Sequence, residues 1–172
     1  EELGLQEANI EFADLRDPYG IEFWPEYKGR DGCRTPMVWE PSNQNGGFST
    51  AARTWLPVAS DHLRHSVATA EADPTAMIHH YRRAISLRHA HPALKSGEMF
   101  DMAVNGTVLH FVRRKDRETI FCAFNLSDSP AEITLPDGNW TPIGAELNSA
   151  HAGLDGKVRL AAWQPCLALR TG

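Results

Sequence analysis

The sequence predicts an α+β chain in which a long irregular segment and one amphipathic helix precede an antiparallel β-sandwich or small barrel. Three observations lead to this fold class. Residues 1–59 contain many Gly and Pro residues and keep no hydrophobic period. Apolar residues then recur at helical spacing from about Pro74 to His89. From Met99 onward the period changes to two, with turn residues between short apolar runs.

The first segment, residues 1–59, is predicted to be one very long loop. Long ordered loops in compact domains are usually functional, because their backbone polar groups must be satisfied by packing or by a ligand. The stretch KGRDGCRTPMVWE, Lys28 to Glu40, concentrates charge, proline and large apolar side chains without a helix or strand pattern. This segment is therefore the first candidate region for a site.

A single helix is predicted from about Pro74 to His89. Asp73 followed by Pro74 is typical of an N-cap and a first turn, and His91 before Pro92 ends the run. The apolar stripe of this helix consists of Met77, Ile78, Tyr81, Ala84 and Ile85. Such a stripe needs a neighbouring surface to cover it.

Short strands are predicted throughout the C-terminal part of the chain. The runs are EMFDMAV, TVLHFVRRK, ETIFCAFNL, AEITL, KVRL and QPCLALR, and the turns between them are Asn105-Gly106, Lys115–Arg117, Pro136–Asn139 and Leu154–Lys157. Hairpins in series favour an antiparallel sandwich or a small barrel. The side chains expected to point into its core are Leu109, Phe111, Ile120, Cys122, Phe124, Leu167 and Leu169.

Charge and composition favour some partners over others. The net charge is −5 over 172 residues, so the surface lacks the basic field that binding to nucleic acid or an anionic membrane needs. No apolar run is long enough to cross a bilayer, and small neutral partners fit better. Cys33, Cys122 and Cys166 have no metal-like spacing and are expected to be free thiols in a reducing compartment, the cytoplasm. Because the sequence begins at Glu1 with no initiator Met and no leader pattern, we expect it to be part of a longer protein.

A metal site is disfavoured by the spacing of the histidines. The helix region contains His79, His80, His89 and His91. Adjacent histidines on a helix point in different directions, and no HExxH or CxxC companion is present. We interpret these residues as part of a helix surface and expect no metal.

A pair of catalytic carboxylates is disfavoured on similar grounds. The candidates in the first segment are Glu22, Glu26, Asp31 and Glu40. General acid and base catalysis needs two carboxylates at a fixed distance, and positions along a loop do not define that distance. Solvated or salt-bridged carboxylates are the favoured interpretation.

Arg30, Asp31 and Arg34 are a stronger candidate for a binding site. A guanidinium stays charged when it is partly desolvated, and it can fork onto a carboxylate or onto vicinal hydroxyls. The apolar wall of such a site could be formed by Trp24, Tyr27, Trp39 and Trp55. The alternative, in which Arg–Asp pairs only hold the loop while the tryptophans bury themselves, fits the spacing equally well.

The motif GRDGCRTPMVWE also resembles a known family, the α-glucosidase and oligo-1,6-glucosidase branch of the α-amylase superfamily of retaining glycoside hydrolases. EELGL is similar to the segment that leaves the eighth strand of that family's barrel. DPYGIEFWPEYKGRDGCRTPMVWE resembles the long loop after this strand, and YRRAISLRHAHPALKSGEM resembles the eighth helix and the start of the C-terminal domain. FCAFNLS is similar to a strand of that β-sandwich domain, so the resemblance covers essentially the whole chain.

The resemblance implies a fold and a division of the chain. Residues 1–94 would form the end of a catalytic (β/α)8 barrel, namely its loop after strand 8 and its helix 8. Residues 95–172 would form the all-β antiparallel sandwich of the C-terminal domain. The missing N-terminal barrel of the same protein would be the main partner. The catalytic Asp, Glu and Asp are expected upstream of Glu1, because none of their motifs is present, and the chain alone would then be inactive.

The same resemblance implies roles for individual residues. Arg34 matches the arginine that pairs with a pocket aspartate and holds the nonreducing-end glucose, and Arg30 is the second choice. Asp31 is expected to orient these arginines. The rim of the leaving-group site would be formed by Phe23, Trp24 and Tyr27. The implied reaction is exo-acting, retaining hydrolysis of terminal α-linked glucose from small oligosaccharides, with no cofactor.

Two other functions remain open at this point. The first is a non-catalytic carbohydrate-binding module, in which exposed aromatic residues of the sandwich such as Trp140 and Trp163 bind glucan. The second is a transglucosidase or isomerase of the same family that acts on sucrose or trehalose.

Overall fold

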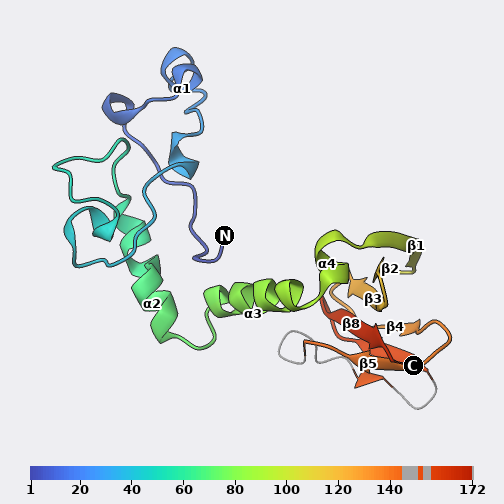
Figure 1. Cartoon of the computed structure of the whole chain (residues 1–172). Coiled ribbons are helices and arrows are strands. Elements are labelled where there is room, and N and C mark those ends of the chain that lie inside the picture. The colour runs from blue at the N-terminus through green and yellow to red at the C-terminus, as the bar shows by residue number, and fades with distance from the viewer. Residues whose placement is uncertain (145–150, 153–155, 172) are drawn as a thin grey trace. The chain divides into compact units, whose positions relative to one another are not determined.

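The computed structural model describes residues 1–144, 151–152 and 156–171 (Figure 1). Contacts divide the chain into two compact units, Glu1–Tyr81 and Arg82–Gly172. This division lies inside helix α3 (Met77–Ala90). The domain boundary after residue 94 that the sequence suggests concerns the end of a barrel and stays a prediction.

The first unit consists of short helices joined by irregular chain, whereas the sequence predicts one long loop without helices for residues 1–59. Its elements are η1 (Phe12–Asp14), α1 (Pro18–Glu22), η2 (Asp31–Cys33), η3 (Gln44–Gly47), η4 (Ser60–His65), α2 (Val67–Ala72) and the first residues of α3. Helix α2 is absent from the sequence-based prediction, because six residues are too few to establish a helical period. Ser66 caps α2, accepting the Thr69 N–H at 3.0 Å.

Side chains bonded to the backbone hold the irregular segment together. The buried His62 places Nε2 2.8 Å from the Gln6 carbonyl oxygen, and its Nδ1 lies 3.3 Å from Thr35 Oγ1. One ring therefore joins three stretches of chain that are remote in sequence. Such contacts supply the hydrogen bonds that helices and strands would otherwise provide.

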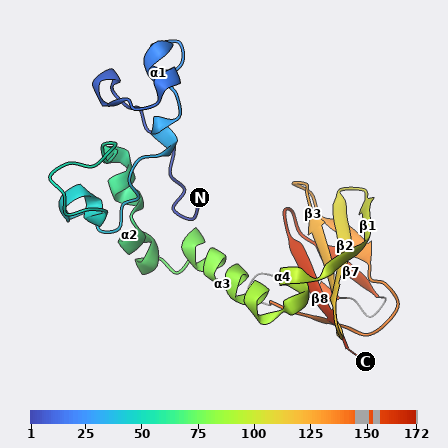
Figure 2. The same ribbon diagram turned by 45° about the horizontal axis from the view of Figure 1, so that its top comes forward.

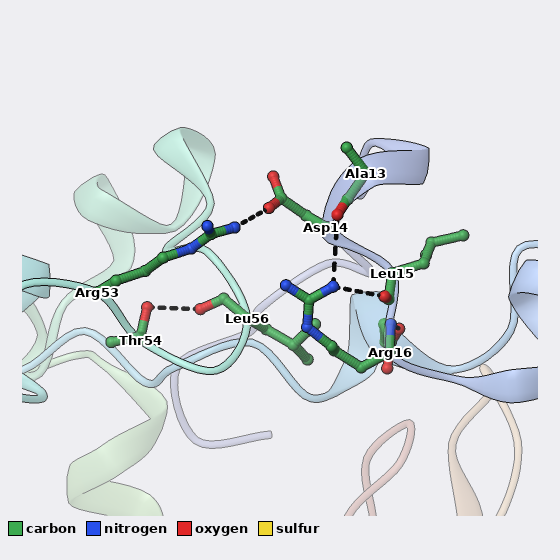
Figure 3. Close-up of polar contacts among 8 residues, drawn as sticks. Ala13, Asp14, Leu15, Arg16, Arg53, Thr54 and Leu56 are labelled. Atoms are coloured by element: carbon green, nitrogen blue, oxygen red, sulfur yellow. Dashed lines mark hydrogen bonds and ion pairs between the residues drawn. The ribbon is translucent and has the colours of Figure 1, made fainter.

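A second set of contacts joins the region of η1 to the chain around residues 53–56 (Figure 3). Arg53 forms an ion pair with Asp14, and Thr54 Oγ1 donates to the Leu56 carbonyl at 2.6 Å. Arg16 Nη1 donates to the Leu15 carbonyl at 2.7 Å. Leu15 and Leu56 are buried beneath these polar contacts.

Helix α3 confirms the predicted helix, with a start three residues later than Pro74. Thr75 and Ala76 form the turn before it, and both of their N–H groups donate to Asp73. Within the first unit, Ile78 of the predicted stripe is buried and Met77 is half exposed. The short helix α4 (Pro92–Ser96) follows α3, with Pro92 at its first position.

The described residues of the second unit form eight strands in two antiparallel sheets. The strands are β1 (Glu98–Asn105), β2 (Val108–Lys115), β3 (Glu118–Asn125), β4 (Ala131–Thr134), β5 (Trp140–Pro142), β6 (His151–Ala152), β7 (Lys157–Leu160) and β8 (Pro165–Arg170). The larger sheet has the order β1-β2-β3-β8-β5, and the smaller has the order β4-β7-β6 (Figures 1 and 2). All six predicted strand runs are confirmed, and β5 and β6 are additional.

The predicted hairpin turns can be checked against the strand register. Asn105 pairs with Val108, and Lys115 pairs with Glu118, so the first two predicted turns are confirmed. The predicted turn at Leu154–Lys157 lies partly outside the described residues. Strand β5 is three residues long and β6 only two, which is too short for an alternating pattern to reveal them.

The predicted set of core side chains lies on the wrong face of the large sheet. The core between the two sheets is formed by the alternate positions, Val108, Val112, Phe121, Ala123 and Cys166, together with Ile133, Val158 and Leu160 of the smaller sheet. Six of the seven predicted residues instead belong to a second cluster with Ala93 and Leu94 of α4, and Leu109 belongs to neither cluster. The six are Phe111, Ile120, Cys122, Phe124, Leu167 and Leu169. Both faces of β3 are apolar because α4 covers one of them, and alternation alone does not say which face meets the second sheet.

The described residues include no helix that is long and apolar enough to cross a membrane. They also hold no group of three or more His, Cys, Asp or Glu side chains arranged to bind a metal ion. No disulfide joins Cys33, Cys122 and Cys166 in the part of the chain that the structure describes.

Candidate functional site

The candidate site is built on the turn that begins helix α1. Asp17 is the N-cap of this helix, and its Oδ1 accepts the Tyr19 N–H at 3.0 Å. Pro18 occupies the first helical position, where its missing N–H costs nothing. The same carboxylate reaches the second half of the site, because Oδ2 accepts the Arg30 N–H at 3.0 Å.

Asp31 connects the same two segments from the other side, through its own carboxylate. Its Oδ2 accepts the backbone N–H of Arg16 at 2.5 Å and that of Asp17 at 2.8 Å. Asp31 is buried, whereas the Arg30 and Arg34 side chains are exposed. Each aspartate therefore binds the backbone of the segment that carries the other, and we call this arrangement the aspartate clasp of Asp17 and Asp31.

Two glycines allow the two segments to approach this closely. A Cβ at Gly20 would lie 2.5 Å from the Lys28 carbonyl oxygen, a separation that real side chains do not reach. Gly29 has φ +74°, and a Cβ there would lie 2.8 Å from the Asp17 Cβ. The clasp thus depends on backbone contact as well as on the carboxylates.

Asp17 of the clasp lines an open cleft of about 510 Å³. The residues lining this cleft are Asp17, Pro18, Tyr19, Tyr27, Arg30 and Arg34. Arg34 Nη1 lies 3.5 Å from Asp17 Oδ2, and the Arg34 side chain is 53% exposed while that of Asp17 is 10% exposed. The Arg34 guanidinium therefore keeps most of its donors free to meet a ligand.

Asp17 is held in its charged form. The pKa of its carboxyl is lowered, first by the hydrogen bond from the Arg30 N–H, with smaller contributions from the Tyr19 and Gly20 N–H groups and from the charge of Arg34. Burial opposes this shift. A carboxylate that already accepts several donors is a structural anion, and is poorly suited to act as a general base.

The structure brings together three of the six residues predicted to bind substrate. Arg34, Arg30 and Tyr27 line the cleft. Phe23 and Trp24 lie outside its lining. The Phe23 ring stacks on Tyr19 with ring centroids 6.0 Å apart, and the Trp24 ring contacts Phe12 at 5.6 Å.

Asp31 is not among the residues that line the cleft, and its role in orienting the arginines stays a prediction. In the described contacts its carboxylate binds backbone N–H groups, while the carboxylate beside Arg34 is Asp17. Asp17 and Tyr19 are therefore the residues that sequence reasoning missed. The DPY sequence at 17–19 carried a signal for Asp17, since Asp before Pro is typical of a helix N-cap.

The remaining aromatic and acidic candidates lie elsewhere. Trp39 and Trp55 are exposed, and the Arg16 guanidinium lies 5.9 Å from the Trp55 ring. Glu22 and Glu26 are exposed, and Glu40 accepts the Ser42 hydroxyl at 3.1 Å. Asp17 is the one carboxylate among the described residues that line the cleft. The cleft therefore offers guanidinium donors for hydroxyls and aromatic rings for apolar faces, but it does not offer two carboxylates for acid and base catalysis.

Comparison with known proteins identifies the family. The profile described as "Alpha amylase, catalytic domain" matches residues 1–97, which include the whole cleft. The chain belongs to the α-amylase family. This agrees with the resemblance of the GRDGCRTPMVWE motif.

Relatives within the α-amylase family differ in their reactions. A probable alpha-glucosidase of Rhizobium meliloti is 47% identical over 163 residues, covering 95% of this chain and 29% of the relative. An oligo-1,6-glucosidase of Parageobacillus thermoglucosidasius is 34% identical, covering 70% of this chain and 21% of the relative. Among solved structures, the alpha-glucosyl transfer enzyme XgtA is 38% identical with a TM-score of 0.78, covering 99% of this chain and 31% of that chain. The chain therefore spans less than a third of the length of each of these relatives.

Proposed function

We propose that this chain is the C-terminal portion of an exo-acting α-glucosidase and that its cleft binds the sugar. The observation that carries the proposal is the pair of guanidinium groups, Arg30 and Arg34, beside Tyr19 and Tyr27 in the part of the chain that matches the α-amylase catalytic domain. Guanidinium donors suit the hydroxyl edges of a sugar, and ring faces suit its C–H faces. A small α-glucoside is the ligand that fits these groups best.

The proposed role of the chain in the reaction is binding and orientation. Barrel active sites lie at the C-terminal ends of the strands, so a loop that follows the last strand forms one wall of the pocket. The catalytic carboxylates would be supplied by the preceding barrel, and retention of configuration would proceed through a covalent glucosyl-enzyme. Arg34 would hold hydroxyls at the nonreducing end, and this closed end would restrict the enzyme to terminal glucose.

The test is substitution of Arg34 in the complete enzyme. Arg34→Ala should lower kcat/KM for an aryl α-glucoside by roughly 30- to 700-fold, corresponding to about 2–4 kcal/mol for a lost charge-assisted hydrogen bond and its unpaired partner. Arg53→Ala is the matched control, because Arg53 pairs with Asp14 outside the cleft. A near wild-type rate for Arg34→Ala would exclude the proposed role.

Glucosyl transfer is a second candidate for the same site. It is favoured by the likeness to the alpha-glucosyl transfer enzyme XgtA, with a TM-score of 0.78. Hydrolysis and transfer share the glucosyl-enzyme and differ in the acceptor that releases it. Measuring the ratio of free glucose to transferred glucose at increasing acceptor concentration in the complete enzyme separates the two.

A separate glucan-binding function of the sandwich has weaker support. Trp163 is 67% exposed, but Trp140 is turned inward, with its ring centroid 6.0 Å from that of Phe121 and its Nε1 donating to the Pro136 carbonyl at 2.7 Å. One exposed ring is a poor platform for an oligosaccharide. Trp163→Ala should accordingly leave the affinity of the complete protein for maltooligosaccharides unchanged.

A further inference from the structure

We propose that Asp17 is a positioning and specificity-determining residue, which sets the geometry and the charge of the arginine cleft. The inference rests on the proposed sugar-binding function of that cleft. Asp17 Oδ2 meets both arginines, accepting the Arg30 N–H at 3.0 Å and lying 3.5 Å from Arg34 Nη1. A single oxygen thus fixes the backbone of one sugar-binding residue and the side chain of the other.

The anchoring of Asp17 makes this oxygen a fixed point. Its Oδ1 accepts the Tyr19 N–H at 3.0 Å, and its own backbone N–H donates to Asp31 at 2.8 Å. Gly29 packs against the Asp17 side chain, because a Cβ at this glycine would lie 2.8 Å from the Asp17 Cβ. The carboxylate therefore has little freedom to follow Arg34, and Arg34 takes its position from the carboxylate.

The two oxygens of the Asp17 carboxylate have different partners. Oδ1 accepts the Tyr19 N–H of the helix cap, whereas Oδ2 accepts the Arg30 N–H and forms the ion pair with Arg34. A carboxamide offers one acceptor oxygen, and its NH2 group is a donor. Asp17→Asn with its oxygen in place of Oδ1 therefore keeps the helix cap and removes the Oδ2 contacts with Arg30 and Arg34.

The charge also determines which sugars the cleft accepts. Two arginines and one aspartate line it, so the cleft carries one net positive charge instead of two. Partial neutralisation favours neutral sugars, whereas two uncompensated guanidiniums favour a phosphate or a carboxylate. Asp17 thus selects against phosphorylated sugars while it orients Arg34 for hydroxyls.

The experiment compares Asp17→Asn and wild type in the complete enzyme. The KM of an aryl α-glucoside should rise by roughly 2- to 5-fold with a smaller change in kcat, the range expected for a half-exposed ion pair. Binding of glucose 6-phosphate and of inorganic phosphate, measured by calorimetry, should tighten by a similar factor, and this gain should vanish at high salt. Asp14→Asn is the matched control, because Asp14 pairs with Arg53 away from the cleft.

The two readouts separate this inference from the proposed function. A wild-type enzyme without activity on α-glucosides would refute the function, yet the phosphate measurement still tests the charge of the cleft. Unchanged KM and unchanged phosphate affinity in a folded Asp17→Asn variant would overturn the inference. If Asp17→Asn fails to fold, Asp17→Glu tests the inference instead. The longer side chain keeps the negative charge but displaces the carboxylate, so KM should rise while phosphate binding stays weak. An unchanged KM in Asp17→Glu would then overturn it.

Discussion

Removal of the Glu118 carboxylate should release helix α4 from the sandwich while the core between the sheets stays closed. Glu118 Oε2 accepts the Ala93 N–H at 2.6 Å, in the first turn of α4, and Oε1 lies 2.7 Å from His91 Nδ1. His91 is the N-cap of α4 and makes no capping bond of its own. Glu118→Ala would therefore leave the Ala93 N–H without its acceptor, at a cost of about 1.5–3 kcal/mol.

Two buried cysteines report separately on the two faces of the large sheet. Cys122 lies in the cluster with Ala93, beneath α4, and Cys166 lies in the core between the sheets. A local opening worth about 1.5–3 kcal/mol should speed the labelling of Cys122 by roughly 10- to 150-fold, since each 1.4 kcal/mol is a factor of ten. The labelling of Cys166 should change little. Mass mapping of a thiol reagent over time measures both rates in one sample.

The design includes a graded variant and a control. Glu118→Gln keeps an oxygen for the Ala93 N–H and should give an intermediate rate. Glu132→Gln removes another glutamate carboxylate, which pairs with Lys157 on the exposed side of the small sheet, and it should leave the labelling of both thiols unchanged. Equal acceleration of Cys122 and Cys166 in Glu118→Ala would mean global unfolding, and no acceleration would mean that Glu118 does not hold α4. Either result refutes the reasoning.

Burial raises the pKa of the Cys122 thiol from 9.0 to about 12. Because the unfolded chain loses this proton first, the free energy of unfolding should fall as pH rises from about 9 to about 12, by at most about 1.4 kcal/mol per pH unit; urea titrations of the chain and of Cys122→Ala should differ in this slope. Asn105, exposed at the end of β1 and followed by glycine, should deamidate faster than Asn45, whose carboxamide donates to two carbonyls at 3.1 and 2.7 Å. Equal rates in peptide mass mapping would contradict this. The buried carboxamide of Asn125 donates to two backbone carbonyls at 2.7 and 2.9 Å. Asn125→Ala should therefore lower the free energy of unfolding by about 2–3 kcal/mol in a thermal or urea melt. A decrease within experimental error would show that water replaces the carboxamide.

The strands were predictable because alternation and turn chemistry are local signals. Asn105-Gly106 and the turn after Lys115 set the register of three consecutive strands, and the structure has that register. The face of the core was not predictable, because Ile120 and Phe121 are adjacent and both buried. Which of them meets the second sheet depends on α4, a five-residue helix that carries almost no periodic signal.

The residues of the candidate site were also only partly predictable from the sequence. Arg30, Arg34 and Tyr27 could be selected from the sequence because residue chemistry alone marks them, and all three line the cleft. The carboxylate that pairs with Arg34 could not be selected in this way. Asp31 lies three residues before Arg34 in the sequence, whereas Asp17 lies much further from it. Proximity in sequence favours Asp31, but the Arg16 and Asp17 N–H groups occupy its carboxylate, which leaves the charge of Asp17 for the guanidinium.

The irregularity of the segment before α2 has a physical explanation in the aspartate clasp. Regular elements satisfy backbone N–H groups with carbonyls of their own ladder, and the side chains then lie at a fixed spacing. Here carboxylates accept the N–H groups of Arg16, Asp17, Tyr19 and Arg30, so the backbone is satisfied without a ladder. The two arginines flank the short helix η2 (Asp31–Cys33), and both line one cleft. High charge and the lack of a periodic pattern in KGRDGCRTPMVWE follow from the same requirement.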